Sequence, residues 1–306
     1  MLSYLQAVVI GLTQGTTELF PISSLGHSVL LPALIGGSWE PLVRQSATQD
    51  SGSSFYLSFI VALHVSTALA LLLFFRQEWV RIIRGFISSL PASVRARRVV
   101  AEDDDSRLAW LIVIATIPVG ITGLLLEHTF RTLFAKPVAA AAFLTVNGIV
   151  LLVGERLRRG SEMALAGRQE PTAGERGTRP VLSMSYREAL GVGAFQVAAL
   201  FAGISRSGAA IVGGLARGLS HEDAAKFSFL LATPVIFAAG VLKLPGLAGP
   251  AAANIHGQVL VGSIVAFAAA YVSVRFLVRY FETRTLTPFA VYSLVAGIAC
   301  LIRFSI

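Results

Sequence analysis

Two short polar clusters lie far apart in an otherwise apolar chain, and their residue types are suited to chemistry on phosphate. The first, residues 14–28, contains the carboxylate of Glu18, several hydroxyls and the imidazole of His27. The second, residues 203–208, places Arg206 between two serines. Ionisable groups at membrane depth are costly, so they usually mark a functional site. We therefore predict that the two clusters meet and form one phosphate-handling site.

Arg206 is the strongest single indication of that chemistry. A guanidinium presents a bidentate cationic fork, which matches the geometry of phosphate oxygens. The neighbouring hydroxyls and backbone N–H groups add donors, and the predicted phosphate-binding residues are Ser23, Ser205, Ser207, Gly203 and Gly208. The alternative role for Arg206 is to neutralise Glu18 in a buried ion pair. The two roles are compatible, because the same arginine can do both.

Ser24 and His27 are spaced for nucleophilic catalysis. If residues 22–30 are helical, positions three apart share a face, so the imidazole can reach the hydroxyl. A serine within hydrogen-bonding reach of a histidine is the minimum equipment for attack on phosphorus. The alternative is a histidine that only packs in an apolar helix. The crowding of polar groups around His27 favours a functional role.

Glu18 has three predicted roles: general base, orienting partner of His27, or ligand of a divalent cation. Gln14 lies four residues earlier and shares the same helical face. Its side-chain oxygen can add a metal ligand or a hydrogen bond. Gln14 and Glu18 are thus the candidate metal ligands, whereas His64 is interpreted as a packing or lining residue.

The composition indicates a polytopic helical membrane protein. Hydrophobic residues make up 55% of the 306 residues and charged residues only 14%, with a mean hydropathy of +0.72; a soluble domain carries about 25% charged residues. The net charge of +8 reflects arginines in loops rather than nucleic-acid binding. The lone Cys300 excludes a disulfide framework. The N-terminus lacks the features of a signal peptide, so we expect it to be retained.

The elements that position the two clusters are predicted to be all-α. Each cluster interrupts a pair of apolar runs too short to cross a bilayer, which favours re-entrant helical hairpins over residues 2–36 and 186–219. Full spans are expected at 55–75, 108–126, 137–154, 224–244, 257–278 and 286–303. Residues 155–185, rich in Arg, Gly and Glu, are predicted to form a flexible loop.

The arginines also predict an orientation. The basic loops 76–107 and 155–185 are separated by two spans, so they lie on the same, cytoplasmic side. The nearly uncharged segments 38–54 and 245–256 then fall outside. On this count the first hairpin enters the membrane from outside and the second from inside.

The opposite orientations suggest an inverted repeat, with one hairpin and three spans in each half, residues 1–154 and 186–306. The stretch Leu19–Ser23 resembles Leu200–Ser205 with one residue inserted. Inverted repeats built around broken helices place binding sites near the midplane, where helix N-termini can face anions.

At these residues the sequence resembles the undecaprenyl-pyrophosphate phosphatases, or bacitracin-resistance membrane phosphatases. The family pattern (Glu/Gln)-x-x-x-Glu, then Pro-x-Ser-Ser-x-Gly-His, is matched by Gln14-Gly-Thr-Thr-Glu18 and Pro21-Ile-Ser23-Ser24-Leu-Gly26-His27. The pattern Pro-Gly-x-Ser-Arg-Ser-x-x-Thr is matched by Ala202-Gly203-Ile-Ser205-Arg206-Ser207-Gly-Ala-Ala210. The similarity covers nearly the whole chain. Ala202 and Ala210 depart from the family's Pro and Thr, and the second change removes a hydroxyl that can contact phosphate.

The resemblance implies hydrolysis of undecaprenyl pyrophosphate to undecaprenyl phosphate and phosphate, which recycles the lipid carrier of cell-wall synthesis. It also implies dependence on Mg²⁺ or Ca²⁺ and a site open to the outer side of the bacterial cytoplasmic membrane. The expected partners are this lipid and the membrane lipids; homodimerisation stays open. Our mechanistic hypothesis is that Ser24 attacks the terminal phosphorus and His27 takes its proton, while Arg206, Ser205 and Ser207 stabilise the transferred group. Glu18, together with Gln14, would position a cation or His27. Alternatively, Glu18 or His27 activates water directly.

Two functions without chemistry compete with this hypothesis. Inverted repeats with broken helices are common in secondary transporters, so the same residues can hold the phosphate of a polyprenyl lipid during flipping. A catalytically inactive scaffold is the third alternative, but it makes no use of the clustered Glu18, Ser24, His27 and Arg206.

Overall fold

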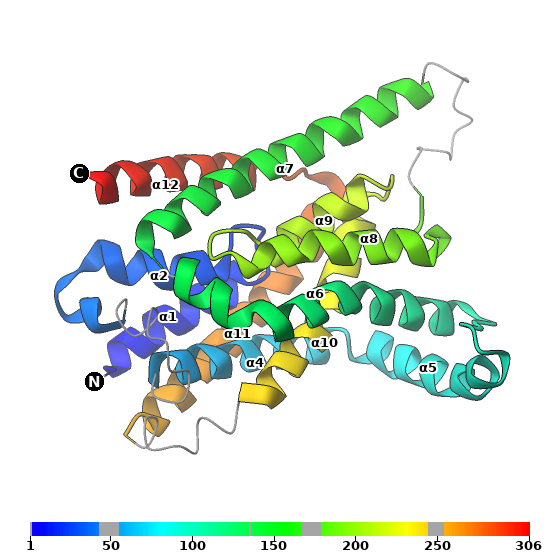
Figure 1. Ribbon diagram of the computed structural model, residues 1–306, viewed down its shortest axis with the longest axis horizontal. Coiled ribbons are helices and arrows are strands. Elements are labelled where there is room, and N and C mark those ends of the chain that lie inside the picture. The colour runs from blue at the N-terminus through cyan, green and yellow to red at the C-terminus, as the bar shows by residue number, and fades with distance from the viewer. Residues whose placement is uncertain (1, 43–54, 135, 167–178, 244–253) are drawn as a thin grey trace.

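The computed structural model describes residues 2–42, 55–134, 136–166, 179–243 and 254–306, which form a bundle of helices (Figure 1). The α-helices are α1 (Tyr4–Thr17), α2 (Ser24–Ile35), α4 (Phe55–Phe74), α5 (Arg76–Ala96), α6 (Asp104–Phe134), α7 (Pro137–Ala166), α8 (Tyr186–Val197), α9 (Arg206–Leu215), α10 (His221–Lys243), α11 (His256–Thr283) and α12 (Thr287–Ser305). Short 3-10 turns occur at Gly37–Trp39, Val181–Ser183 and Ala198–Leu200. The predicted all-α class is confirmed.

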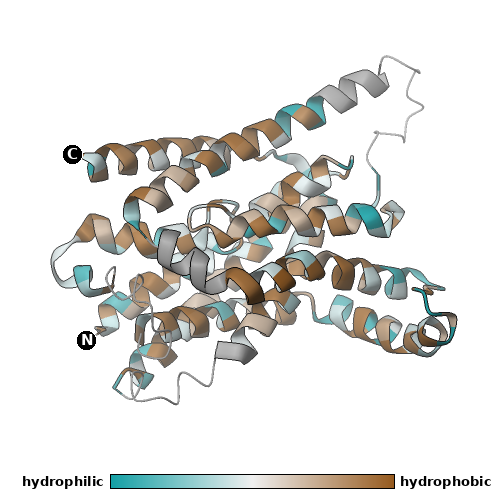
Figure 2. Ribbon diagram, in the orientation of Figure 1, coloured by the Kyte–Doolittle hydropathy of each residue, from teal (hydrophilic) through white to brown (hydrophobic). Residues whose placement is uncertain are grey.

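Six helices in the described part of the chain are long and apolar enough to cross a membrane. They are Phe55–Phe74, Asp104–Leu126, Pro137–Arg159, His221–Gly240, His256–Thr283 and Thr287–Ser305. Each of the six predicted spans coincides with one of them. Many of their large apolar side chains point outward: Leu125 is 75% exposed and Val272 is 67% exposed. Such a surface is stable against lipid rather than water, and the apolar colouring of Figure 2 follows these helices along their length.

The first hairpin consists of α1 and α2, which pack against each other. A capping box formed by Ser3 and Gln6 starts α1. The helix ends at Thr17, and α2 begins only at Ser24. At 14 and 12 residues, both helices are shorter than the roughly 20 residues that a span needs. The irregular backbone between them carries the first polar cluster.

The second hairpin is built in the same way from α8 and α9. Ser185 and Glu188 form a capping box at the start of α8. Gly203 adopts a φ of 116° between the two helices, a conformation that glycine tolerates. The Ser205 side chain then caps α9 by accepting the N–H of Gly208. The second polar cluster therefore occupies the tip of this hairpin and the first turn of α9.

Two segments predicted as basic loops are partly helical, which corrects the prediction. Residues 76–96 form α5, because small or apolar residues recur at helical spacing and face α6: Ile82, Gly85, Ser89 and Ser93 are buried. The Trp110 indole also donates to the Ser89 hydroxyl at 3.0 Å. The many arginines obscured this pattern. Residues 167–178 of the predicted loop 155–185 lie outside the described residues.

α7 continues to Ala166, well beyond the predicted end of its span at residue 154. The buried Glu155, the first residue after the predicted end of the span, explains why the helix continues there. Its Oε2 atom lies 2.8 Å from Nε2 of His221 and accepts the N–H of Leu286 at 3.3 Å. A carboxylate with such partners is tolerated inside the bundle, so its charge does not end the helix.

Close helix contacts surround the two hairpins, with α1 packed on α11 and α8 packed on α6. A Cβ atom at Gly15 would collide with the backbone of Ala266, and one at Gly193 with the backbone of Ala115. Small residues let membrane helices approach in this way. The first helix of each hairpin therefore packs against a long helix from the other half of the chain. This reciprocal packing supports the inverted repeat, which stays a prediction.

Figure 1 places the α5–α6 turn, the far end of α7 and the start of α8 at one end of the bundle. Both chain termini lie at the other end. Hydrophilic residues gather at the α5–α6 turn and at the start of α8 (Figure 2). The segments predicted to be cytoplasmic therefore share one end of the molecule.

Candidate active site

The two polar clusters lie against each other at the meeting point of the hairpin tips. The N–H of Gly203 donates to the Ser23 hydroxyl at 3.1 Å. Asn147, buried in α7, ties both tips together: its amide donates to the carbonyl of Pro21 at 2.9 Å and accepts the N–H of Ser205 at 2.9 Å. Asn147 is not among the site residues predicted from the sequence. The structure assigns it a central place between the tips.

Glu18 is the centre of the site and is 6% exposed. Its Oε1 atom lies 2.9 Å from Nη2 of Arg206. Its Oε2 atom accepts the hydroxyl of Ser24 at 2.5 Å and the amide of Gln14 at 3.0 Å, and lies 3.3 Å from Nε2 of His64. A buried carboxylate needs such compensation, because charge is poorly solvated inside a protein. The ion pair with Glu18, which was the alternative role for Arg206, is present, whereas its role in binding phosphate stays a prediction.

His27 does not form the predicted hydrogen bond with Ser24. Its Nδ1 atom lies 2.7 Å from the carbonyl oxygen of Ser23, and its Nε2 atom lies 2.8 Å from the hydroxyl of Tyr292. The two rings also stack, with centroids 5.8 Å apart. Because a carbonyl only accepts, Nδ1 carries a hydrogen, whereas the Tyr292 hydroxyl is able to donate to Nε2 or to accept from it. Both nitrogens are therefore engaged, and the Ser24 hydroxyl faces Glu18 instead.

The local backbone explains this outcome. Ser23 has a φ of 70°, which is uncommon for a residue with a side chain. Its hydroxyl accepts the N–H groups of Gly203 at 3.1 Å and Gly26 at 3.2 Å, and these bonds hold the conformation. The turn directs Ser24 toward α1, while His27 packs back over Ser23. Strained residues of this kind concentrate at functional sites.

The predicted phosphate-binding groups are largely bonded within the protein. The Ser23 hydroxyl joins the two tips, and the Ser205 hydroxyl accepts the N–H of Gly208 at 3.1 Å and lies 3.0 Å from the Ser207 hydroxyl. By contrast, Nη1 of Arg206 is buried without a hydrogen-bond partner. The first N–H groups of α9 also lack intrahelical acceptors, as at every helix start. Arg206 and this helix terminus are thus the groups best suited to an anion.

The candidate cation ligands fit Mg²⁺ or Ca²⁺ poorly. Both oxygens of Glu18 face nitrogen or hydroxyl donors, and the Arg206 guanidinium lies within 2.9 Å. The Gln14 Oε1 atom has no hydrogen-bond partner, but it adds a single neutral ligand. Among the described residues no three His, Cys, Asp or Glu side chains gather to hold a metal. Hard cations prefer several oxygen ligands, which the protein alone does not supply here.

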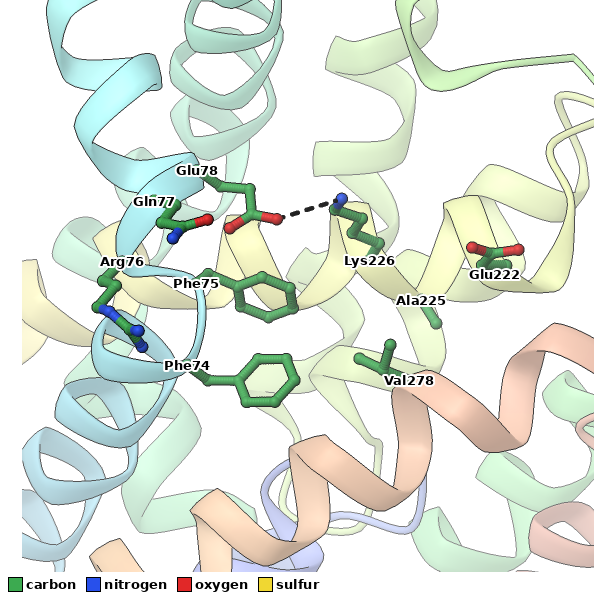
Figure 3. Close-up of a pocket in the computed structure, with 9 residues that line it drawn as sticks. All are labelled: Phe74, Phe75, Arg76, Gln77, Glu78, Glu222, Ala225, Lys226 and Val278. Carbon is green, nitrogen blue, oxygen red and sulfur yellow. Dashed lines mark ion pairs between the residues drawn. The ribbon is translucent and has the colours of Figure 1, made fainter.

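A cavity of about 380 Å³ lies elsewhere, where α4 passes into α5 beside α10 and α11 (Figure 3). Its lining combines aromatic, apolar and charged side chains: Phe74, Phe75, Arg76, Gln77, Glu78, Glu222, Ala225, Lys226 and Val278. The Lys226 ammonium lies 3.5 Å from Glu78 across it. None of the predicted site residues lines this cavity, so it is separate from the candidate active site.

The arrangement around Glu18 is suited to phosphoryl transfer. A hydroxyl is held 2.5 Å from a carboxylate, and a guanidinium with a free N–H edge lies beside the same carboxylate. The fold and the site together define a class: a multi-pass membrane protein with a buried serine–carboxylate–arginine site between two broken hairpins.

Comparison with known proteins identifies the family. The model described as "Bacitracin resistance protein BacA" matches residues 7–299, and the chain belongs to this family. It is 56% identical to undecaprenyl-diphosphatase 2 of Frankia alni, covering 100% of this chain and 99% of the relative. It is also 56% identical to the undecaprenyl-diphosphatase of Mycolicibacterium paratuberculosis, covering 98% and 97%. The identity with undecaprenyl-diphosphatase 1 of Burkholderia pseudomallei is 41%, covering 96% and 94%.

The two departures from the family pattern lie next to the site but not in its polar centre. Ala210 is 1% exposed and belongs to the main apolar core. Ala202 packs at the edge of a smaller apolar cluster that includes Val29 and Leu144. Neither position carries a hydrogen bond of the Glu18 network.

His64 and Tyr292 were missed as site residues. For His64 the available signal was a histidine inside an apolar span. Nothing in the sequence marked Tyr292.

Proposed function

We propose that this chain is an integral membrane phosphatase that hydrolyses undecaprenyl diphosphate to undecaprenyl phosphate and inorganic phosphate. One observation carries the proposal: the Ser24 hydroxyl is held 2.5 Å from the Glu18 carboxylate. The same carboxylate pairs with Arg206, whose Nη1 atom has no hydrogen-bond partner. Relatives that share 55–56% of their residues with the chain over nearly full length are named undecaprenyl-diphosphatases. The activity recycles the lipid carrier for cell-wall synthesis and gives resistance to bacitracin, as the family name says.

In the proposed reaction the Ser24 oxygen attacks the terminal phosphorus and its proton passes to Glu18. An oxygen–phosphorus bond to Ser24 forms, the anhydride bond breaks, and undecaprenyl phosphate leaves. Water then attacks the phosphoserine and the bond between phosphorus and the Ser24 oxygen breaks. The proton held by Glu18 returns to that oxygen, which restores the Ser24 hydroxyl as phosphate leaves. Arg206 and the N-terminus of α9 stabilise the charge on the transferred group. Glu18 thereby replaces His27 as the partner of Ser24.

We further propose the bacterial cytoplasmic membrane as the location, with the site open to its outer side. The asymmetry of arginines between the two ends of the bundle supports this orientation. The divalent cation, Mg²⁺ or Ca²⁺, is proposed to arrive bound to the diphosphate oxygens, because the protein offers one carboxylate that is already engaged. Homodimerisation remains a prediction.

The test is phosphate release from undecaprenyl diphosphate by the detergent-solubilised protein, with Mg²⁺ or with a chelator. We expect release by the wild type and a loss of at least about a thousandfold in Arg206→Ala, the scale on which arginines act in phosphoryl transfer. Removing one partner of a buried ion pair costs about 3–5 kcal/mol of stability. Arg206→Lys therefore serves as a second variant that keeps the charge but loses the fork.

The matched control is Arg187→Ala, at an exposed arginine in the first turn of α8, which we expect to retain wild-type turnover. A folded wild type that binds the lipid but releases no phosphate in either condition contradicts the proposal. That result would favour the polyprenyl-phosphate flippase instead. The assay in detergent separates the two functions, because transport requires two compartments and hydrolysis does not.

A further inference from the structure

His64 contacts Glu18, although it belongs to neither hairpin. It lies on α4, and its Nε2 atom is 3.3 Å from Oε2 of Glu18, the oxygen that also accepts the Ser24 hydroxyl at 2.5 Å. The His64 side chain is 21% exposed and that of Glu18 is 5% exposed. The imidazole thus reaches the carboxylate in a largely buried setting, where a polar contact is retained only if its donors and acceptors match.

The other ring nitrogen determines which atom of His64 is the donor. Nδ1 lies 2.8 Å from the carbonyl oxygen of Ile60. A carbonyl oxygen only accepts, so Nδ1 carries a hydrogen. In a neutral ring, Nε2 would then present a lone pair to a carboxylate oxygen, and two acceptors would face each other. A hydrogen between Nε2 and Oε2 removes this mismatch.

We propose that His64 is a positioning residue for the reaction: its Nε2–H donates to Glu18 and holds the carboxylate toward Ser24. The inference rests on the proposed phosphatase function and adds to it a residue outside the two polar clusters. In this arrangement the ring carries hydrogens on both nitrogens, one for Ile60 and one for Glu18.

Because His64 lies on α4, its contact with Glu18 has a role that the Arg206 contact does not have. Arg206 holds Oε1 of Glu18 and is also the group with a free N–H edge for phosphate. If Arg206 moves when it binds phosphate, its contact with Oε1 of Glu18 therefore changes. His64 holds the other oxygen from α4, which belongs to neither hairpin tip. The Ser24–Glu18 hydrogen bond is thereby kept in place while Arg206 engages the substrate.

The kinetic test compares His64→Gln with His64→Leu. Leucine removes the donor, whereas glutamine keeps an N–H donor in a side chain of similar reach. We expect kcat for phosphate release to fall about a hundredfold in His64→Leu, the effect of misplacing a catalytic group by about 1 Å. His64→Gln should recover at least tenfold of that loss, with KM within about threefold of the wild type in both variants.

His256→Gln and His256→Leu are the matched controls, since His256 is exposed at the start of α11; both should retain wild-type kcat. Equal losses in the two His64 variants would indicate packing and overturn the proposal. So would a His64→Leu variant with wild-type kcat.

A second measurement does not depend on activity. The chain contains five histidines, so nitrogen NMR of ¹⁵N-histidine-labelled protein gives few signals, and His64→Gln identifies the ring. We expect hydrogens on both His64 nitrogens at neutral pH in the wild type and on Nδ1 alone in Glu18→Ala. A wild-type ring with one hydrogen overturns the assigned donor. If the wild type releases no phosphate but the spectrum is as expected, the function has failed and the contact stands.

Discussion

At the scale of single residues, Glu18 explains why the polar clusters tolerate burial. Ser24, Gln14, His64 and Arg206 surround one carboxylate, so its charge is compensated inside the bundle. A charge in such a place is costly unless it is paired and hydrogen-bonded. The same compensation positions a hydroxyl, a carboxylate and a guanidinium for one reaction.

Ser24→Ala tests whether the reaction passes through a covalent intermediate. If Ser24 is the nucleophile, phosphate release should fall at least about a thousandfold, as it does when other serine nucleophiles are removed. Ser28→Ala is the matched control, because the Ser28 hydroxyl lies on the same helix and donates to the carbonyl of Leu25 at 2.9 Å. We expect this control to be nearly fully active.

Turnover of Ser24→Ala within about tenfold of the wild type would exclude the covalent route and favour water activated by Glu18. Loss of activity alone leaves Ser24 as nucleophile or as binding group. Acid quenching during turnover of substrate labelled at the terminal phosphate separates these, since only a nucleophile retains the label on the protein.

At the scale of secondary-structure elements, short helices and close contacts create the site. Neither α1 nor α2 can span a bilayer alone, and neither can α8 or α9. Their tips therefore meet inside the bundle, where irregular backbone is tolerated because Asn147 and Ser23 satisfy it. The position of each tip depends on how closely its first helix packs against a long span.

Gly193→Ala tests this dependence. A Cβ atom at Gly193 in α8 would collide with the backbone of Ala115 in α6, so the helices must separate. Overpacking of this kind costs about 1–3 kcal/mol, and we expect a lower Tm in detergent together with reduced turnover.

Gly120→Ala is the matched control within α6, because a Cβ atom there meets nothing within 4 Å. We expect an unchanged or slightly higher Tm, since alanine favours a helix by about 1 kcal/mol over glycine. Equal thermal stability of the Gly193 variant and the wild type would show that the close α6–α8 contact is dispensable.

At the scale of the whole molecule, the distribution of arginine predicts the orientation in the membrane. Helix α5 carries four arginines and one acidic residue. This helix and the α5–α6 turn lie at the opposite end of the bundle from the chain termini (Figure 1). Positive residues are retained in the cytoplasm during insertion. The Gly37–Trp39 turn beyond the first hairpin should therefore lie outside.

Single cysteines test this orientation. Cys300 is the only cysteine of the chain and is buried, so Cys300→Ala gives a suitable background. In protoplasts, Ser38→Cys should react with a membrane-impermeant maleimide from outside, whereas Arg98→Cys should react only after lysis. Both positions are exposed, so the reverse pattern would require the opposite orientation.

The sequence by itself determined the class of the protein, its six long spans and the types of residue at its site. Hydropathy and helix length are local properties, so the spans at 55–75 and 286–303 matched α4 and α12 closely. The resemblance of the residues around Glu18 and Arg206 to a family pattern predicted membership, which comparison confirmed. The helical parts of 76–107 and 155–185 were missed because clustered charges obscured their periodicity.

Only the tertiary structure decided which side chains face one another. Ser24 and His27 are close in sequence, yet the φ of 70° at Ser23 turns them apart. His27 meets Tyr292 from α12, and Glu18 meets His64 from α4. Hydrogen-bond partners at membrane depth are chosen by which helices pack together, because each buried polar group must find a donor or acceptor nearby. Residue type and spacing along the chain do not contain that information.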